Sequence, residues 1–321
     1  MSSAPPSGPD PAVDPASLAL HPFIRDLVDR LLAASPLAAS GPEAMRRAND
    51  PVARALFGQA RPVERVEDRV ISHGGLSLSA RIFIPASARG ALVYLHGGGY
   101  VLGGPEVYDS LCRNLALDVG CAVVCPDYRL APEHKFPAAV EDAYAALAWT
   151  AREFGGPVAL AGDSAGATLC LAACLLAGDR GGPRPVGQVL AFPCADMSSF
   201  GTESHRRYGR GLFLTVELLA FFRDCYLSDP AQARDPLVSP LLAPDLSHQP
   251  PTRLILAEHD LLRDEALALA RRLREAGAPC EATVQPGMIH GFFGMHGIGP
   301  KENGLAEAAS FLRRVLSGEN P

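Results

Sequence analysis

The stretch "VALAGDSAGATLCLAACLLA", Val158–Ala177, decides the fold of this chain. A short apolar run leads into the pattern Gly-x-Ser-x-Gly around Ser164, and a long run rich in Ala and Leu follows it. A strand that turns sharply into a helix at a serine is the context in which this pattern exposes a nucleophile. The five letters also fit a polar turn with a capping serine, so the rest of the chain must discriminate between these interpretations.

Short apolar runs recur along the chain, separated by segments with helical periodicity. Continuous apolar runs of this length are typical of strands that are buried on both faces of a parallel sheet. Two alternating segments, "VERVEDRVI" and "LSLSARIFIP", flank Gly74-Gly75 and predict an antiparallel hairpin at the sheet edge. The sequence therefore predicts an α/β fold with a central, mostly parallel, eight-stranded sheet flanked by helices. The other expected strands are "ALVYLH", "CAVVCPDY", "VALAGDS", "VGQVLAFP", "RLILAEHD" and "CEATVQ".

The strand–helix alternation is interrupted once, between residues 196 and 251. This segment contains one clear helical pattern, Thr215 to Leu227, in a Pro-rich context. More than fifty residues between two strands exceed an ordinary connection, so we interpret the segment as an insertion over the sheet. We expect a disordered tail over 1–15, N-terminal cap helices over 16–60, a catalytic domain over 61–195 and 252–321, and an insertion over 196–251 that contributes to the cap. The expected N-terminal helices are Leu18 to Ala33 and Pro42 to Phe57.

Composition excludes several other classes of protein. The 321 residues carry a net charge of -6, and no long Lys/Arg run is present, which argues against a nucleic-acid or anionic-membrane surface. No apolar run reaches the roughly 18 residues that span a bilayer, and the polar start lacks the features of a secretory signal. The eight cysteines form no Cys-x-x-Cys pair. We therefore expect a cytoplasmic protein without a metal site or structural disulfide.

A reactive serine needs a base and an acid that orients it. His290 lies in "PGMIHGF", a glycine-bounded loop after the last predicted strand, and Asp260 ends the strand "LILAEHD". Ligand sites of open α/β sheets lie at the carboxyl ends of the strands, where both residues fall. The order Ser164, Asp260, His290 is the one expected of α/β hydrolases. Four weaker candidates remain nearby: His259, His296, Glu258 and Asp264.

A glycine run directly after a predicted strand supplies the fourth part of the site. "HGGGY", His96 to Tyr100, follows "ALVYL" and leaves backbone N–H groups uncovered. Together with the N–H of Ala165, these donors can hold the oxyanion of a tetrahedral intermediate. We expect His96 to brace this loop.

Five ordered motifs, "HGGGY", "PDYRLAPEHKFPAAVED", "GDSAG", "EHDLLRDE" and "IHGF", resemble the hormone-sensitive-lipase-like group of α/β-hydrolase carboxylesterases, bacterial family IV. The resemblance extends from about Leu18 to Leu316. It implies a small helical cap and a catalytic triad of Ser164, Asp260 and His290. It further implies that the oxyanion donors are the N–H groups of Gly98, Gly99 and Ala165, with Gly97 as an additional candidate.

The resulting hypothesis is a serine carboxylic-ester hydrolase that needs no cofactor and acts on a small ester with a short to medium acyl chain. Two alternatives stay open: a biosynthetic tailoring enzyme (acyltransferase, deacetylase or dehydratase), and a non-catalytic small-molecule receptor of the same fold. Receptors in this family lack the histidine, whereas His290 is present here. The sequence also leaves a homodimer open. The apolar residues expected to line the substrate pocket are Tyr100, Phe213, Leu214, Phe222 and Phe292.

Overall fold

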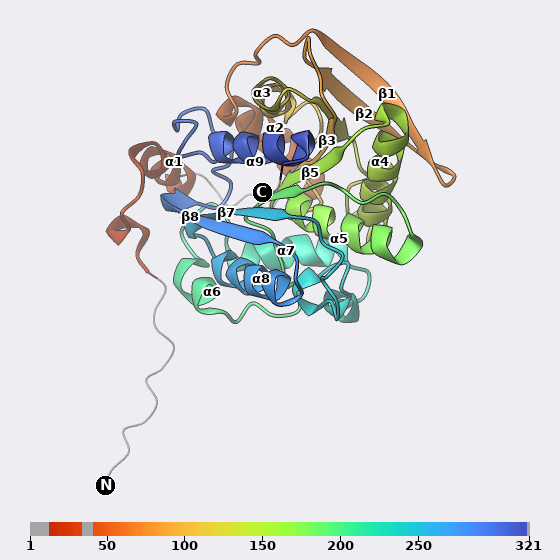
Figure 1. The fold of residues 1–321 in the computed structure, drawn as a ribbon. Coiled ribbons are helices and arrows are strands. Elements are labelled where there is room, and N and C mark those ends of the chain that lie inside the picture. The colour runs from red at the N-terminus through yellow and green to blue at the C-terminus, as the bar shows by residue number, and fades with distance from the viewer. Residues whose placement is uncertain (1–12, 34–40, 320–321) are drawn as a thin grey trace.

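The computed structural model describes residues 13–33 and 41–319, so most of the predicted tail lies outside the described residues. A twisted eight-stranded sheet crosses the molecule in the order β1-β2-β4-β3-β5-β6-β7-β8 (Figure 1). The pairs β1–β2 and β2–β4 are antiparallel, and all other pairs are parallel. The predicted α/β class, with its antiparallel edge hairpin, is confirmed. The strands are β1 Arg65–His73, β2 Leu76–Ile84, β3 Ala91–Leu95, β4 Ala122–Pro126, β5 Val158–Asp163, β6 Gln188–Ala191, β7 Thr252–His259 and β8 Cys280–Ile289.

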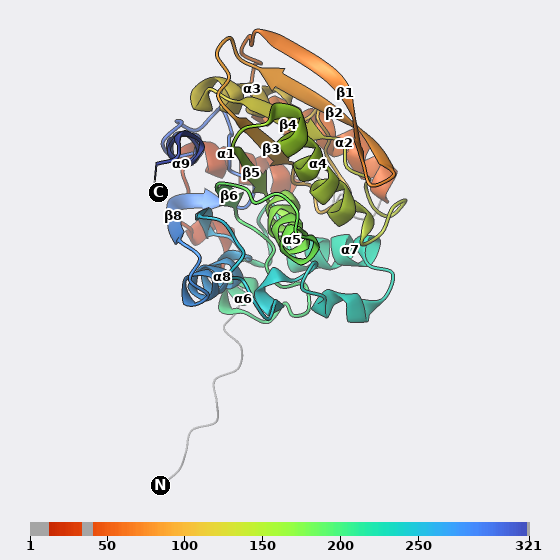
Figure 2. The same ribbon diagram turned by 45° about the vertical axis from the view of Figure 1, so that its right-hand side comes forward.

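Helices cover both faces of the sheet. The helices α4, α5 and α8 pack on one face, where α4 and α5 lie side by side (Figure 2), and α3 and α9 pack on the other. The four central strands β3, β4, β5 and β6 are buried along their whole length, which explains their uninterrupted apolar sequences. These helices span α3 Asp109–Val119, α4 Ala138–Phe154, α5 Ala165–Arg180, α8 Arg263–Glu275 and α9 Leu305–Ser317.

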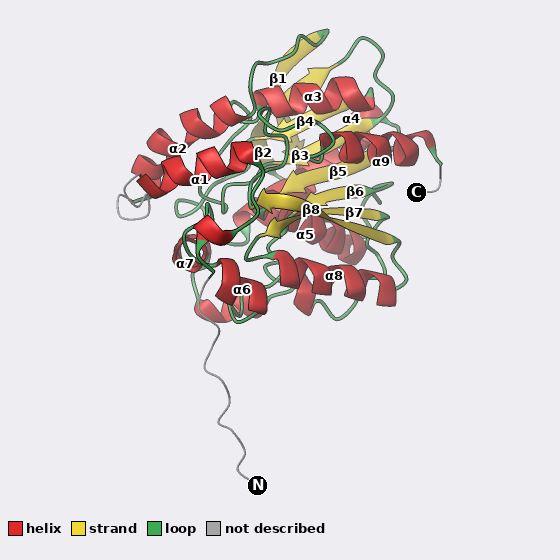
Figure 3. Cartoon of the chain, turned by 90° about the vertical axis from the view of Figure 1, so that its left-hand side faces the viewer, coloured by secondary structure: helices red, strands yellow, loops and turns green. Residues whose placement is uncertain are grey.

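The remaining helices come from the N-terminal segment and from the insertion. In Figure 3 the labels α1, α2, α6 and α7 gather at one end of the sheet, away from the C-terminus. The parallel strands end on this side, so these helices lie above the strand ends that carry the predicted site. They span α1 Pro22–Ala33, α2 Pro42–Leu56, α6 Glu203–Tyr208 and α7 Val216–Tyr226, with short 3₁₀ turns at Pro15–Ser17, Pro230–Arg234 and Pro240–Leu242.

Two element boundaries differ from the sequence prediction by four residues, and one helix is missing from the prediction. Helix α1 begins at Pro22 and not at Leu18, and the backbone N–H of His21 donates to the carbonyl of Gly287. Proline favours the first position of a helix, which accounts for the later start. Strand β8 runs on to Ile289, beyond the predicted end at Gln285. Helix α6 is not predicted, because six residues are too few for a helical period to be visible in the sequence.

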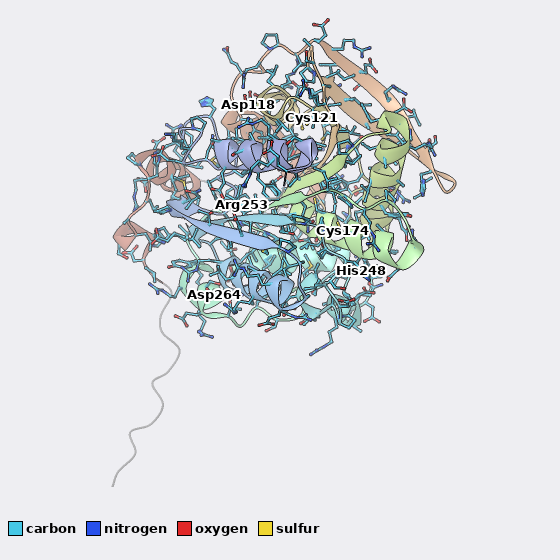
Figure 4. The ribbon with its side chains drawn as sticks, in the orientation of Figure 1. Asp118, Cys121, Cys174, His248, Arg253 and Asp264 are labelled. Carbon is cyan, nitrogen blue, oxygen red and sulfur yellow. The ribbon has the colours of Figure 1, made fainter. Side chains whose placement is uncertain are left out.

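The cysteines take no part in a disulfide. All eight are free thiols, and six of them are buried, including Cys121 and Cys174, which are labelled in Figure 4. Among the residues that the structure describes, no three His, Cys, Asp or Glu side chains come together as a metal site. Over the same residues, no helix combines the length and apolarity required to cross a membrane.

Candidate active site

Ser164 occupies a sharp turn between β5 and α5. Its backbone has φ +52° and ψ −122°, a strained conformation for a residue with a side chain. The flanking glycines make the turn possible. A Cβ at Gly166 would lie 1.9 Å from the carbonyl oxygen of Leu95, and one at Gly162 would lie 2.6 Å from the backbone of Gly166. The elbow therefore packs directly against the end of β3, and its geometry presents the serine hydroxyl at the sheet edge.

The structure brings the three predicted triad side chains together at the carboxyl ends of β5, β7 and β8. His290 Nε2 lies 2.9 Å from Ser164 Oγ, and His290 Nδ1 lies 2.8 Å from Asp260 Oδ2. The second oxygen of Asp260 accepts the backbone N–H of Leu262 at 2.9 Å. Since a carboxylate only accepts hydrogen bonds, Nδ1 carries the proton and Nε2 faces the serine as the acceptor. This tautomer is the one that a general base requires.

Three of the four weaker candidates make their contacts elsewhere. His259 packs its ring against Tyr208, and burial lowers its pKa. The backbone of His296 donates to Leu56, and its ring lies against Gly58. Asp264 lies in the first turn of α8 and accepts the N–H of Ser204 at 2.8 Å. None of these contacts involves Ser164.

The glycine loop after β3 lies beside Ser164 and has an unusual backbone. Gly98, Gly99 and Tyr100 all have positive φ, at +115°, +61° and +65°. In the described part of the chain, the N–H groups of Gly98, Gly99 and Ala165 have no hydrogen-bond acceptor, and these residues line the cavity that contains Ser164. The N–H of Gly97, by contrast, is engaged by Asp163 Oδ1 at 3.0 Å. This contact excludes Gly97 as an additional oxyanion donor.

Asp163, which was not among the predicted site residues, supports this loop from below. Its carboxylate accepts Tyr94 Oη at 2.7 Å, Tyr108 Oη at 3.0 Å and the N–H of Gly97. Burial raises the pKa of Asp163, while the three hydrogen bonds act in the opposite direction by favouring the charged form. The sequence did contain a signal for this role, because Asp163 is an acidic residue at the end of an otherwise apolar strand. A buried carboxylate at such a position needs several hydrogen-bond donors around it.

His96 braces the loop from its other side. Its Nδ1 lies 2.8 Å from the carbonyl oxygen of Gly97, and its ring stacks on Tyr128 with centroids 4.2 Å apart. The hydroxyl of Tyr128 donates to the carbonyl of His96 at 2.8 Å. Burial lowers the pKa of His96 to about 4. At neutral pH this imidazole is therefore uncharged, which suits a bracing role in the apolar interior.

A cavity of about 540 Å³ opens above the triad. Its base contains Ser164 and His290, and its walls are mostly apolar side chains from α2, α7 and the segment before α7. Four of the five predicted pocket residues line it: Tyr100, Phe213, Leu214 and Phe222.

Phe292 was wrongly predicted to line the cavity. It is fully buried and packs against Phe192, with ring centroids 5.5 Å apart. The chain turns at Gly291, which has φ +86°, directly after His290. The side chain of the next residue therefore enters the core beneath the site.

The sheet order and the strand–elbow–helix turn at its centre define the class as an α/β hydrolase. A family model described as "alpha/beta hydrolase fold" matches residues 92–294. The carboxylic ester hydrolase LipN of Mycobacterium tuberculosis is 41% identical over 255 residues, which are 75% of this chain and 68% of that protein. The ethyl acetate hydrolase of Pseudomonas putida is 36% identical over 88% of this chain and 92% of its own length.

The solved structures lead to the same family. A hyperthermophilic esterase from the archaeon Pyrobaculum calidifontis superposes with a TM-score of 0.86 at 37% identity, covering 92% of this chain and 98% of that one. The chain therefore belongs to the hormone-sensitive-lipase-like group, bacterial family IV, of α/β-hydrolase carboxylesterases.

Proposed function

We propose that this carboxylesterase hydrolyses its ester through an acyl-enzyme on Ser164, with His290 as the general base and Asp260 as the orienting acid. One observation carries the proposal: the chain of contacts from Asp260 Oδ2 to His290 Nδ1 at 2.8 Å and from His290 Nε2 to Ser164 Oγ at 2.9 Å. The names of the relatives, among them an ethyl acetate hydrolase, support an ester as the substrate.

The reaction follows from this geometry. Ser164 Oγ attacks the ester carbonyl while His290 Nε2 accepts its proton, and Asp260 stabilises the imidazolium that forms. The imidazolium then protonates the leaving alcohol oxygen as the C–O bond breaks. A water molecule, deprotonated by the same nitrogen, then attacks the acyl carbonyl. As the bond to Ser164 Oγ breaks, the imidazolium returns the proton to that oxygen and the carboxylic acid leaves.

The negative charge that develops on the carbonyl oxygen is stabilised by backbone donors. The unpaired N–H groups of Gly98, Gly99 and Ala165 are the proposed oxyanion hole. The positive end of the α5 dipole lies at the same place, because Ala165 is the first residue of that helix. One donor of this kind contributes a factor on the order of 10²–10³ in rate.

We further propose that the N-terminal helices over 16–60 and the insertion over 196–251 form a cap that sets the substrate range. Both segments supply walls of the cavity, through residues such as Met45, Leu56, Phe213 and Phe222. A mostly apolar cavity of about 540 Å³ favours short to medium acyl chains. The cytoplasmic location and the homodimer stay predictions.

The test is a panel of p-nitrophenyl esters of increasing chain length and matching anilides, measured with wild type and Ser164→Ala. We expect ester turnover that falls for long acyl chains and drops by roughly 10⁴ or more in the variant. Product analysis with added alcohol distinguishes hydrolysis from acyl transfer, because a transferase yields a new ester. Near wild-type turnover in Ser164→Ala would refute the proposal.

A further inference from the structure

Arg46 on α2 lies outside the triad but ties three separate segments together. Its Nε donates to the carbonyl of Val101 at 2.7 Å, and its Nη2 donates to the carbonyl of Ala131 at 2.8 Å. Its two Nη atoms also form a bidentate pair with Glu133, at 2.8 and 2.7 Å. The Arg46 side chain is only 23% exposed, and such fork-like contacts fix a guanidinium in one orientation.

The two carbonyl groups that Arg46 contacts lie where the glycine loop meets the segment after β4. Val101 follows directly after Tyr100, and the carbonyl of Tyr100 accepts the N–H of Ala131 at 2.8 Å. Arg46 therefore holds both sides of the junction through which the glycine loop is anchored to the segment after β4.

Val101, whose carbonyl Arg46 holds, also contacts the peptide group that carries the Gly99 N–H. The N–H groups of Val101 and Leu102 both donate to the carbonyl of Gly98, at 3.0 and 2.9 Å. In a planar trans peptide the C=O and the following N–H point in opposite directions. The carbonyl of Gly98, held on the side of Val101 and Leu102, therefore directs the N–H of Gly99 away from that turn.

A second residue of α2 contacts the same loop. Asp50 lies one turn after Arg46, on the same helix face, and its Oδ1 accepts the N–H of Gly103 at 3.3 Å. Met45, which precedes Arg46, and Asn49, which precedes Asp50, line the substrate cavity. Helix α2 thus holds the loop at Val101 and at Gly103 while forming part of the wall above it.

We propose that Arg46 is a positioning residue for the oxyanion hole, which holds the Gly98–Gly99 backbone in its donating orientation from a helix outside the sheet. Loss of Arg46 then weakens the binding of the tetrahedral oxyanion more than the binding of the planar ester. This inference rests on the proposed function of Gly98 and Gly99 as donors.

The experiment compares Arg46→Met and Arg46→Lys with the control Arg47→Met. Arg47 is the neighbouring residue on α2, its side chain is 66% exposed, and its partner is Glu43 on the same helix. For each variant, kcat and KM are measured with p-nitrophenyl acetate. The inhibition constant of an alkyl trifluoromethyl ketone, which forms a tetrahedral adduct with the serine, is measured as well.

We expect Arg46→Met to lower kcat by roughly 10- to 100-fold, less than deletion of a donor costs. KM should stay within about 2-fold, and the inhibitor should bind more weakly by about the same factor as kcat/KM falls. Arg46→Lys keeps the charge but loses the planar guanidinium that donates to several acceptors at once. Its kcat and inhibitor affinity should lie between those of Arg46→Met and wild type. Arg47→Met should behave as wild type.

Unchanged kcat and unchanged inhibitor affinity in a folded Arg46→Met protein would overturn the inference, as would a change confined to KM or Tm. If Arg46→Met does not fold, Arg46→Lys decides by the same criteria. An inactive wild type would instead refute the proposed function, so the two failures are distinguishable.

Discussion

The two sides of the site are built in different ways. On one side, Ser164, Asp260 and His290 are side chains at the ends of strands, linked by two direct hydrogen bonds. On the other side, the proposed donors are backbone N–H groups of a loop with three successive positive φ angles. A reactive side chain can be removed by substitution, whereas a backbone donor can only be displaced. The supports of the loop, such as Asp163 and Arg46, are therefore where variation can tune the oxyanion side.

The largest effect is expected on the triad side, from Asp260→Asn. The amide cannot reproduce a carboxylate that accepts His290 Nδ1–H and the N–H of Leu262 together, so the imidazole loses its productive tautomer. We expect kcat to fall by about 10⁴ in steady-state assays with a short p-nitrophenyl ester. Asp264→Asn is the matched control, because Asp264 contacts Ser204 instead. Equal losses in the two variants would contradict the assignment of the acid.

A smaller effect is expected on the oxyanion side, from Gly99→Ala. The new Cβ would lie 2.3 Å from Phe222 Cγ, at a backbone with φ +61°, so the loop or α7 must shift. Because displacement of one donor costs a factor on the order of 10², we expect a loss of that size in kcat.

Two further variants test whether the contact between the new Cβ and the Phe222 ring causes the loss of kcat. Adding Phe222→Ala to Gly99→Ala should restore part of the lost rate, since it removes the ring that the new methyl group meets. Gly156→Ala, where the nearest atom lies at 3.9 Å, should leave the rate unchanged. A full-rate Gly99→Ala enzyme would show that the loop does not hold the oxyanion.

The smallest expected effect concerns stability and comes from the ion pair between Arg46 and Glu133. The pH dependence of this contribution distinguishes it from the effects on the triad. The Arg46 guanidinium lowers the pKa of Glu133 from 4.5 to about 2. This ion pair therefore stabilises the fold above about pH 5, and its contribution is lost as the pH falls from about 5 to 2. Glu133 is 53% exposed, so we expect Glu133→Gln to lower Tm by about 2 °C or less at pH 7. The difference from wild type should shrink by pH 3, and a difference that grows in acid would contradict the pairing.

The same contrast explains which features were predictable from the sequence. The sheet and the triad follow from short apolar runs with a polar residue at the end, because the chain order of such runs carries the spatial arrangement. Asp260 was separable from Asp264 by its place at the strand end, and His290 from His296 by the same rule. The glycine run was informative because it follows a strand directly.

The supports were not predictable, since they depend on tertiary contacts between residues far apart in the chain. Arg46 belongs to no motif, and its partners Val101 and Ala131 contribute only backbone carbonyls. The Tyr94 and Tyr108 hydroxyls meet Asp163 only after β3, α3 and β5 have packed together. Phe292 was misplaced because the turn at Gly291 reverses the direction of its side chain, and a sequence pattern does not reveal that φ angle.

Under the proposed mechanism, Ser164, activated by His290 and Asp260, forms the covalent bond to the substrate. The most direct measurement is to inactivate the enzyme with p-nitrophenyl diethyl phosphate and to map the adduct by peptide mass spectrometry while following esterase activity. We predict one diethylphosphoryl group per chain, on the peptide containing Ser164, with activity lost in proportion to labelling. Full activity in labelled protein, or an adduct on any other residue that accounts for the inactivation, would contradict the claim.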